Sequence, residues 1–245
     1  MKETKSRIFI VSLAVALFFS LVVSSTVAIL KEKQDRNIKE DRLKHILTVA
    51  GDFKKMKILL LDLKTDEYRQ IDNDVDFYNR FRTLSTGKDA IKLTKDNDLI
   101  GVGSIPSRIP VYLFYDDGGR LVRVVFFIYG NGLWSTMYGF IGVEKDLKTI
   151  YGITFYDQKE TPGLGGEVDN PNWKMKWKGK KIFKDDGELA LKVGKNIDND
   201  IYTVDGLSGA TMTTKGVDNI IKFWFGENGY GRFLKKLSEV KDGDL

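Results

Sequence analysis

The chain has 245 residues, of which 42% are hydrophobic and 30% charged, and this composition excludes a disordered tail or a collagen-like fibre. The formal net charge of +5 is spread over interleaved acidic and basic residues, which argues against nucleic-acid binding. There is no cysteine and one histidine, His45. This excludes disulfides, thiolate-bound zinc, iron–sulfur clusters held by the chain's own cysteines and bis-histidine haem. We expect no metal site, and any redox role requires an organic cofactor.

The first structural signal is an uncharged stretch over residues 8–30. A helix of this length measures about 35 Å, enough to cross a hydrocarbon core of about 30 Å. The alternative is a cleaved secretory signal, because Thr26 and Ala28 resemble a small-x-small cleavage site. Apolar segments of such signals are only about 7–15 residues long. The sequence therefore predicts an uncleaved, single-pass membrane anchor over residues 1–30.

The orientation of this anchor does not follow from its flanking charges. Basic residues lie on both sides of the apolar stretch, so the positive-inside rule does not decide. A short leader before a large domain slightly favours a domain outside the membrane.

Residues 31–50 predict an amphipathic juxtamembrane helix. Its apolar positions Leu43, Ile46, Leu47 and Ala50 are three or four residues apart, and Gly51 is a suitable C-terminal stop. His45 lies between these positions, and we interpret it as a surface or packing residue.

The rest of the chain indicates an α+β domain. Residues 51–110 read as a variable, helical or irregular part with one helix near 77–84. From residue 111 onward, apolar runs separated by Asp116–Gly119 and by Glu144–Lys148 predict antiparallel hairpins. A last helix is predicted over 214–225, capped by Thr213 or Thr214. The core is expected over 111–235, followed by a polar tail over 236–245.

Three glycine-bearing segments are candidates for a binding site. In the segment DGLSGATMT (205–213), small residues precede a helix N-terminus, where free N–H groups and the helix dipole favour a phosphate. The segment ETPGLGG (160–166) lacks the spacing of a dinucleotide-binding motif or a P-loop. In GNGLW (130–134), Trp134 either packs in the core or covers an aromatic ligand. Each segment can also be a plain turn.

The first of these segments resembles the flavinylation motif of FMN-binding domains, Asp-x-x-Ser/Thr-Gly-Ala-Thr. The order and spacing of GNGLWSTMYGFIGVE, YGITFYDQKETPGLGGEVDNPNW and SGATMT are similar to the NqrC family, whose members are subunits of sodium-translocating NADH:quinone oxidoreductases. The resemblance is strongest over about 130–225. A related family, the paralogous subunits of ion-translocating ferredoxin:NAD oxidoreductases (Rnf), shares two of the segments but usually has a histidine where this chain has Lys159.

The resemblance implies which residues serve the cofactor. Thr211 would carry FMN covalently through its phosphate. The other residues that the resemblance places around the FMN are Asp205, Ser208, Gly209, Ala210, Thr213, Glu160, Thr161, Gly163, Leu164, Gly165 and Trp134. No residue is expected to act as a catalytic group.

The same resemblance implies the role of the chain. It would be an electron-carrying subunit in the bacterial inner membrane, with its soluble domain on the periplasmic side. Its partners would be the other subunits of the complex and a flavin transferase that attaches the FMN. The alternatives are the paralogous subunit of the Rnf complex and a non-redox, membrane-tethered binding module.

Overall fold

The structure is a computed structural model that describes residues 5–53, 55–195 and 200–239. Its first element, α1 (Lys5–Ala50), is one continuous helix. The segment Ser6–Lys31 of α1 is long and apolar enough to cross a membrane, judged by length and composition. The predicted anchor and the predicted juxtamembrane helix are therefore parts of a single helix. Contacts divide the chain into two compact units, residues 1–43 and 44–245, so the last turns of α1 belong to the second unit.

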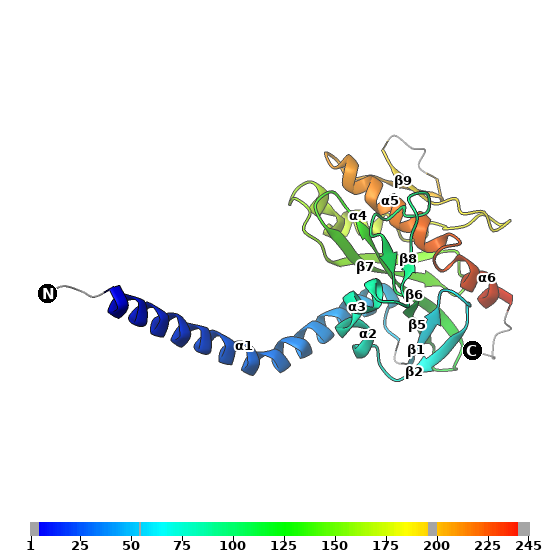
Figure 1. Ribbon diagram of the computed structural model, residues 1–245. Helices are drawn as coiled ribbons and strands as arrows, with labels where there is room; N and C mark the ends of the chain where they lie inside the picture. Colours follow the sequence, from blue (N-terminus) through cyan, green and yellow to red (C-terminus); the bar gives the residue numbers. More distant parts are fainter. Residues whose placement is uncertain (1–4, 54, 196–199, 240–245) are drawn as a thin grey trace. The chain divides into compact units, whose positions relative to one another are not determined.

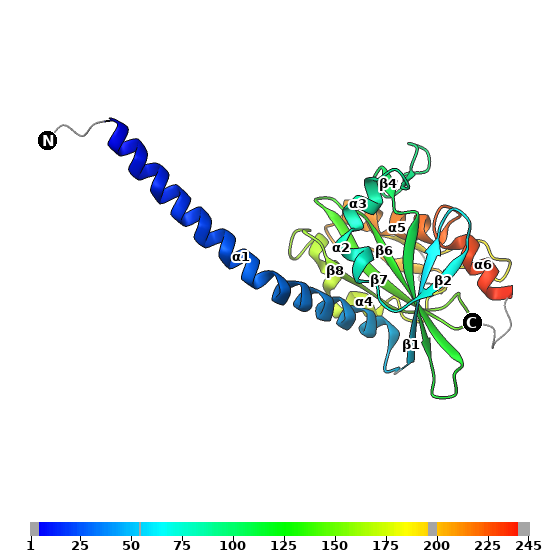
Figure 2. The same ribbon diagram turned by 60° about the horizontal axis from the view of Figure 1, so that its bottom comes forward.

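The second unit is built on one antiparallel sheet of six strands (Figure 2). In spatial order these are β2 (Tyr68–Ile71), β1 (Lys55–Asp62), β5 (Arg108–Tyr115), β6 (Leu121–Asn131), β7 (Thr136–Glu144) and β8 (Ile150–Asp157). All five neighbouring pairs are antiparallel. This confirms the predicted α+β class and both predicted hairpins.

Helices cover both faces of this sheet. On one face, α2 (Val75–Asn79) and α3 (Phe81–Thr86) pack their phenylalanines edge-on against Phe127 and Tyr129 of β6. On the other face, Phe126 contacts Phe225 of α5 (Thr211–Phe225). Successive side chains of a strand point to opposite faces, so a strand buried on both faces is apolar throughout. This explains the continuous apolar runs of β5 and β6.

Helix α5 lies close against β6 (Figure 1). A Cβ atom on Gly216 would approach the carbonyl oxygen of Asn131 to 2.6 Å, and one on Gly130 would approach Ile220 to 2.6 Å. Trp224 Nε1 fixes the same contact by donating to the carbonyl oxygen of Tyr129 at 2.7 Å. The close approach places the N-terminus of α5 beside the end of β6.

The remaining elements are short, except for α6 at the C-terminal end (Figure 1). They are β3 (Ile91–Lys92), β4 (Ser104–Ile105), η1 (Gly165–Asp169), α4 (Pro171–Met175), β9 (Lys192–Gly194), β10 (Thr203–Asp205) and α6 (Gly231–Glu239). Strands β9 and β10 pair in parallel, and β3 pairs with β4 antiparallel.

The last turn of α1 packs into the second unit, with Ile46, Val49 and Ala50 buried. The predicted apolar face is therefore only partly right, because Leu43 and Leu47 are exposed. The helix ends as predicted, before a glycine.

The two local predictions around this turn are confirmed. Gly51 has a positive φ of 87° and its N–H donates to the Leu47 carbonyl oxygen at 2.9 Å, a common helix ending. His45 is a packing residue whose Nδ1 lies 3.1 Å from Thr154 Oγ1 and whose ring lies 5.9 Å from that of Tyr156.

Three predictions for the flanking regions are corrected by the structure. Residues 51–110 are not an irregular part, because β1 and β2 belong to the main sheet. The helix expected near 77–84 is two short helices that meet at Arg80. Helix α5 begins three residues earlier than predicted and is not the last, since α6 continues into the predicted polar tail. Residues 240–245 of that tail lie outside the described residues.

Gly142 tests how the end of α1 is seated on the sheet. A Cβ atom on Gly142 would overlap the carbonyl oxygen of Val49, whereas one on its cross-strand partner Gly152 would lie 3.8 Å from Val49 Cγ1, an ordinary contact. We expect Gly142→Ala to lower the free energy of unfolding of the detergent-solubilised chain by about 1–3 kcal/mol, because overpacking forces backbone shifts. The matched Gly152→Ala should change it by less than about 0.5 kcal/mol. Equal effects in denaturant titrations would contradict this seating.

Candidate functional site

The structure brings the three glycine-bearing segments together. The loop between β6 and β7 (residues 132–135) and the N-terminal part of α5 both hydrogen-bond to the side chain of Glu160, which follows β8. The segment ahead of α5 also touches the loop after Glu160, since a Cβ atom on Gly209 would lie 2.8 Å from Leu164 Cδ2. Segments from three distant parts of the sequence therefore form one site.

Glu160 is the centre of this site, and it is only 5% exposed. Its carboxylate accepts hydrogen bonds from three consecutive backbone N–H groups, those of Leu133 (3.1 Å), Trp134 (2.9 Å) and Ser135 (3.3 Å). It also accepts one from Thr213 Oγ1 at 2.5 Å. Successive N–H groups of this kind form an anion-binding concavity. The carboxylate oxygens of Glu160 are therefore turned inward and occupied by these donors, and a contact between Glu160 and a flavin edge stays a prediction.

Two glycines leave the room that this carboxylate needs. A Cβ atom on Gly132 would approach Glu160 Oε1 to 2.6 Å, and one on Gly165 would approach Thr213 Oγ1 to 2.5 Å. Gly165 is buried, so it supports the site from within rather than contacting a ligand at the surface. A side chain at either position would displace the carboxylate or its donors.

The hydrogen bonds decide the ionisation of Glu160. Burial raises the pKa of the carboxyl group, but the hydrogen bonds from Thr213 and from the three loop N–H groups lower it more, so the pKa lies below its ordinary value of 4.5. Glu160 is therefore ionised at neutral pH. Among the described residues, no lysine or arginine forms an ion pair with it, and N–H and O–H donors alone stabilise the charge.

The hydroxyl groups near the start of α5 have different environments. Thr213 is 1% exposed and its hydroxyl donates to Glu160, so this hydroxyl is turned away from the surface. Thr214 is also buried, and its Oγ1 accepts from the N–H of Leu207 at 2.9 Å. Neither threonine caps the helix, which corrects the predicted cap. The N-cap is Ala210, whose side chain cannot accept a hydrogen bond.

Thr211 is the first residue of α5 and is exposed, as is Ser208. Because Ala210 provides no capping side chain, the first N–H groups of α5 are left for an external acceptor, and the helix dipole favours a negative charge there. Gly209 has a φ of +74°, which suits glycine, and a Cβ atom there would lie 2.8 Å from Leu164 Cδ2. An exposed hydroxyl thus lies at a helix end suited to an anion.

Large apolar side chains are exposed on all three segments. We call Leu133, Trp134, Leu164 and Met212 the apolar patch. Trp134 is 69% exposed, so it does not pack in the core. Exposed apolar side chains gathered by a rigid scaffold mark a ligand or partner surface. Leu133 and Met212 were not predicted as site residues, although each lies inside a motif that was recognised.

The loop after Glu160 presents the other predicted residues. Thr161 and Gly163 are exposed, and the Thr161 carbonyl oxygen accepts from the N–H groups of Leu164 (3.0 Å) and Gly166 (2.9 Å). Gly163 has a φ of +76°. This tight turn holds Leu164 at the surface.

Asp205 is exposed and forms an ion pair with Lys176, whose Nζ lies 2.9 Å from Asp205 Oδ2. The carbonyl oxygen of Asp205 accepts from Trp173 Nε1 at 2.8 Å, and Trp173 packs against the buried Trp177 at 5.4 Å between ring centroids. The tryptophans that follow ETPGLGG thus support the segment 205–213 from the buried side. Lys176 was not predicted, because an ion pair between distant segments leaves no local pattern.

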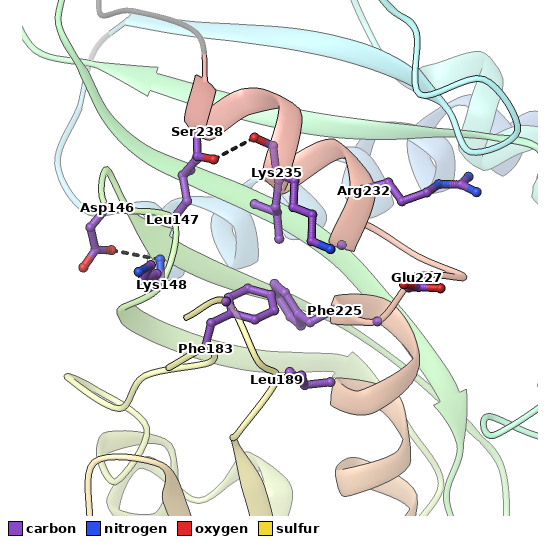
Figure 3. A pocket seen from close by; sticks show the side chains of 14 residues that line it. Asp146, Leu147, Lys148, Phe183, Leu189, Phe225, Glu227, Arg232, Lys235 and Ser238 are labelled. Carbon is purple, nitrogen blue, oxygen red and sulfur yellow. Dashed lines mark hydrogen bonds between the residues drawn. The ribbon is translucent and has the colours of Figure 1, made fainter. Parts of the chain in front are cut away.

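A separate cavity of about 280 Å³ lies beside α6 (Figure 3). Phe183, Leu189 and Phe225 form part of its apolar wall. Two cations at its rim already have carboxylate partners, since Arg232 pairs with Asp66 at 3.0 Å and Lys148 lies 4.0 Å from Asp185. The cavity shares no lining residue with the three-segment site.

The lowered pKa of Glu160 predicts a pH-dependent stability. A carboxyl group whose pKa is lowered on folding stabilises the protein above its unfolded pKa, near 4.5, and loses this effect as the pH falls through the folded-state pKa. We expect Glu160→Gln to lower the free energy of unfolding by about 1–3 kcal/mol at pH 7. The difference from the unsubstituted chain should shrink as the pH falls from 4.5 towards 3. Denaturant titrations across this range measure it, and a constant difference would contradict the assignment.

Comparison with known proteins identifies the family of the chain. Residues 132–226 match the FMN-binding domain family. The NqrC subunit of the Na(+)-translocating NADH-quinone reductase of Yersinia pestis is 39% identical, with 98% of this chain and 97% of that protein covered. The same subunit of Neisseria meningitidis is 41% identical over 98% of this chain and 96% of that protein.

Two solved structures have the same fold. The crystal structure of Shewanella oneidensis NqrC matches with a TM-score of 0.74 and 34% identity, covering 83% of this chain and all of that one. The crystal structure of the corresponding Na(+)-translocating NADH-quinone reductase subunit from Parabacteroides distasonis matches with a TM-score of 0.56 and 26% identity, covering 84% of this chain and 95% of that one. The chain therefore belongs to the NqrC family of subunits of the Na(+)-translocating NADH-quinone reductases, an oxidoreductase complex, and carries its FMN-binding domain.

Proposed function

We propose that this chain is a membrane-anchored flavoprotein subunit that carries FMN on a phosphoester to Thr211 and relays electrons within a sodium-pumping NADH:quinone oxidoreductase. The observation that carries the proposal is the difference between two threonines of one motif. Thr211 is exposed at the first position of α5, whereas Thr213 is buried and bonded to Glu160.

The residues present fit FMN. Its phosphate suits the uncapped N-terminus of α5, where Gly209 and Ala210 leave the backbone accessible. The apolar patch offers a surface for the flat ring system. When bound, FMN supplies the electron chemistry, and the charges and dipoles of the protein set its potential. Glu160 contributes a fixed negative charge behind the β6–β7 loop.

Attachment of the FMN requires help from another protein. The bond from Thr211 Oγ1 to phosphorus forms as the bond from phosphorus to its leaving group breaks, and the hydroxyl proton is lost. A threonine hydroxyl does not ionise at neutral pH. The only histidine, His45 of α1, packs against Thr154 of β8. We therefore infer that a flavin transferase supplies the base and recognises the exposed Asp205 and the residues Ser208–Ala210.

The length and composition of α1 and the membership of the family support a proposed location. We infer that the Ser6–Lys31 segment spans the bacterial inner membrane once and that the FMN-binding domain lies on the periplasmic side. The partners would be the other subunits of the complex, which exchange electrons with the FMN. We expect neither NADH nor quinone to bind this chain directly.

The exposed and buried threonines give the sharpest test. In the full-length chain co-expressed with a flavin transferase, Thr211→Ala should abolish covalent flavin, seen as the loss of flavin fluorescence from the band on a denaturing gel. Thr213→Ala should keep the flavin, because its hydroxyl faces Glu160. It should lower the free energy of unfolding by about 1–3 kcal/mol, since a buried hydrogen bond is lost.

Thr213→Ala is the matched control, because it removes a hydroxyl from the same motif but from a buried position. Flavin that persists in Thr211→Ala would contradict the assignment of the linkage. An unsubstituted chain that stays colourless after co-expression would favour the alternative of a non-redox, membrane-tethered module.

A further inference from the structure

The β6–β7 loop depends on one carboxylate for most of its hydrogen bonds. The N–H groups of Leu133, Trp134 and Ser135 all donate to Glu160, and the N–H of Gly132 donates to the Ser135 carbonyl oxygen at 2.8 Å. The side chains of Leu133 and Trp134 are exposed, so packing contributes little to holding them. Apart from the bond that Ser135 Oγ accepts from the Lys159 N–H at 2.9 Å, the Glu160 carboxylate is the contact that holds this loop to the segment after β8.

Glu160 itself is not positioned to touch a ligand. It is buried, and each of its oxygens already accepts at least one hydrogen bond. The groups that it holds do reach the surface. Its hydrogen bond to the Trp134 N–H holds the loop that carries the exposed indole, and its hydrogen bond to Thr213 holds the first turn of α5, where Thr211 is exposed. One buried carboxylate thus links the proposed attachment point of the cofactor to the loop that carries the exposed Trp134 indole.

We propose that Glu160 is a positioning residue for the flavin: it holds the β6–β7 loop so that Trp134 lies against the ring system tethered at Thr211. This inference rests on the proposed function. It assigns to Glu160 a role through the loop, in place of direct contact with the ring. The same carboxylate then ties both the β6–β7 loop and the first turn of α5 to the segment after β8.

Substitutions at Glu160 separate this role from general stability. In Glu160→Gln, the amide has one acceptor oxygen, and its NH₂ group would face N–H donors, so part of the loop loses its acceptor. Glu160→Asp keeps the charge but is one methylene shorter. Glu167→Gln is the matched control, because Glu167 lies in the same segment and accepts from the Asn170 side chain at 2.6 Å, with no bond to the β6–β7 loop.

The experiment uses the full-length chain, flavinylated by co-expression and purified in detergent. Intact mass first establishes one FMN per chain in each variant. Flavin fluorescence yield and visible circular dichroism then report how the ring is held, because an indole against the ring quenches its emission. We expect the yield to rise at least twofold in Glu160→Gln and less in Glu160→Asp, with Glu167→Gln unchanged.

Two further measurements connect the effect to the loop. Hydrogen exchange at the amides of residues 133–135 should be slow in the unsubstituted chain and at least tenfold faster in Glu160→Gln. Trp134→Leu should itself raise the flavin fluorescence, and adding Glu160→Gln to it should cause no further rise, because the two substitutions act through one contact.

The outcomes distinguish the possible failures. If the unsubstituted chain carries no FMN by mass, the proposed function fails and this inference fails with it. If the FMN is present but Glu160→Gln leaves the flavin signals unchanged, or adds fully to Trp134→Leu, the positioning role alone is overturned. Should Glu160→Gln not fold, Glu160→Asp decides: flavin signals identical to those of the unsubstituted chain would overturn the proposal.

Discussion

The candidate site depends on the hydrogen bonds of a single buried carboxylate. Glu160 accepts from three consecutive N–H groups of the β6–β7 loop and from the hydroxyl of Thr213 on α5. A buried charge is costly unless it is well hydrogen-bonded, so these donors and the carboxylate require one another. Without Glu160, the loop and the first turn of α5 would have no common partner at this position.

The sheet sets where this carboxylate can act. Helix α5 lies close to β6 because both contain a glycine at the contact. Gly130 of β6 lies against Ile220 of α5, and Gly216 of α5 lies against Asn131 of β6, and neither glycine has a side chain to separate the two elements. The N-terminus of α5 therefore lies beside the loop that follows β6. Thr211 is exposed at this helix end, while Thr213, two residues later on the helix, turns into the protein. The geometry of one helical turn thus gives two similar residues different chemical surroundings.

Local patterns predicted much of this architecture. Neighbouring residues predicted the two hairpins, with turns at Asp116–Gly119 and Glu144–Lys148, and the end of α1 before Gly51. They also predicted that a helix begins near the end of the segment 205–213, and the structure contains all of these features. The pairing of β1 with β5 was missed, because it joins residues about 50 apart and leaves no periodic signal. The buried states of Glu160 and Thr213 were missed for a related reason: both residues are polar, and only their mutual contact makes burial possible.

The family resemblance predicted which segments meet at the candidate site, but not the orientation of each side chain in it. It placed Glu160, Leu164, Trp134 and Thr211 in one site, and the structure brings their segments together. It did not distinguish residues that face the surface from those that support the site from within. That distinction depends on the depth of each side chain in the fold, which spacing along the chain does not encode.

The most direct test of this account is an electron-density map of the full-length, flavin-loaded chain. We predict density for FMN that is continuous with Thr211 Oγ1, with the ring system over Leu133, Trp134 and Leu164 and with Glu160 still bound to the β6–β7 loop. Density for the flavin on Ser208 or Thr213, or in the cavity beside α6, would contradict it.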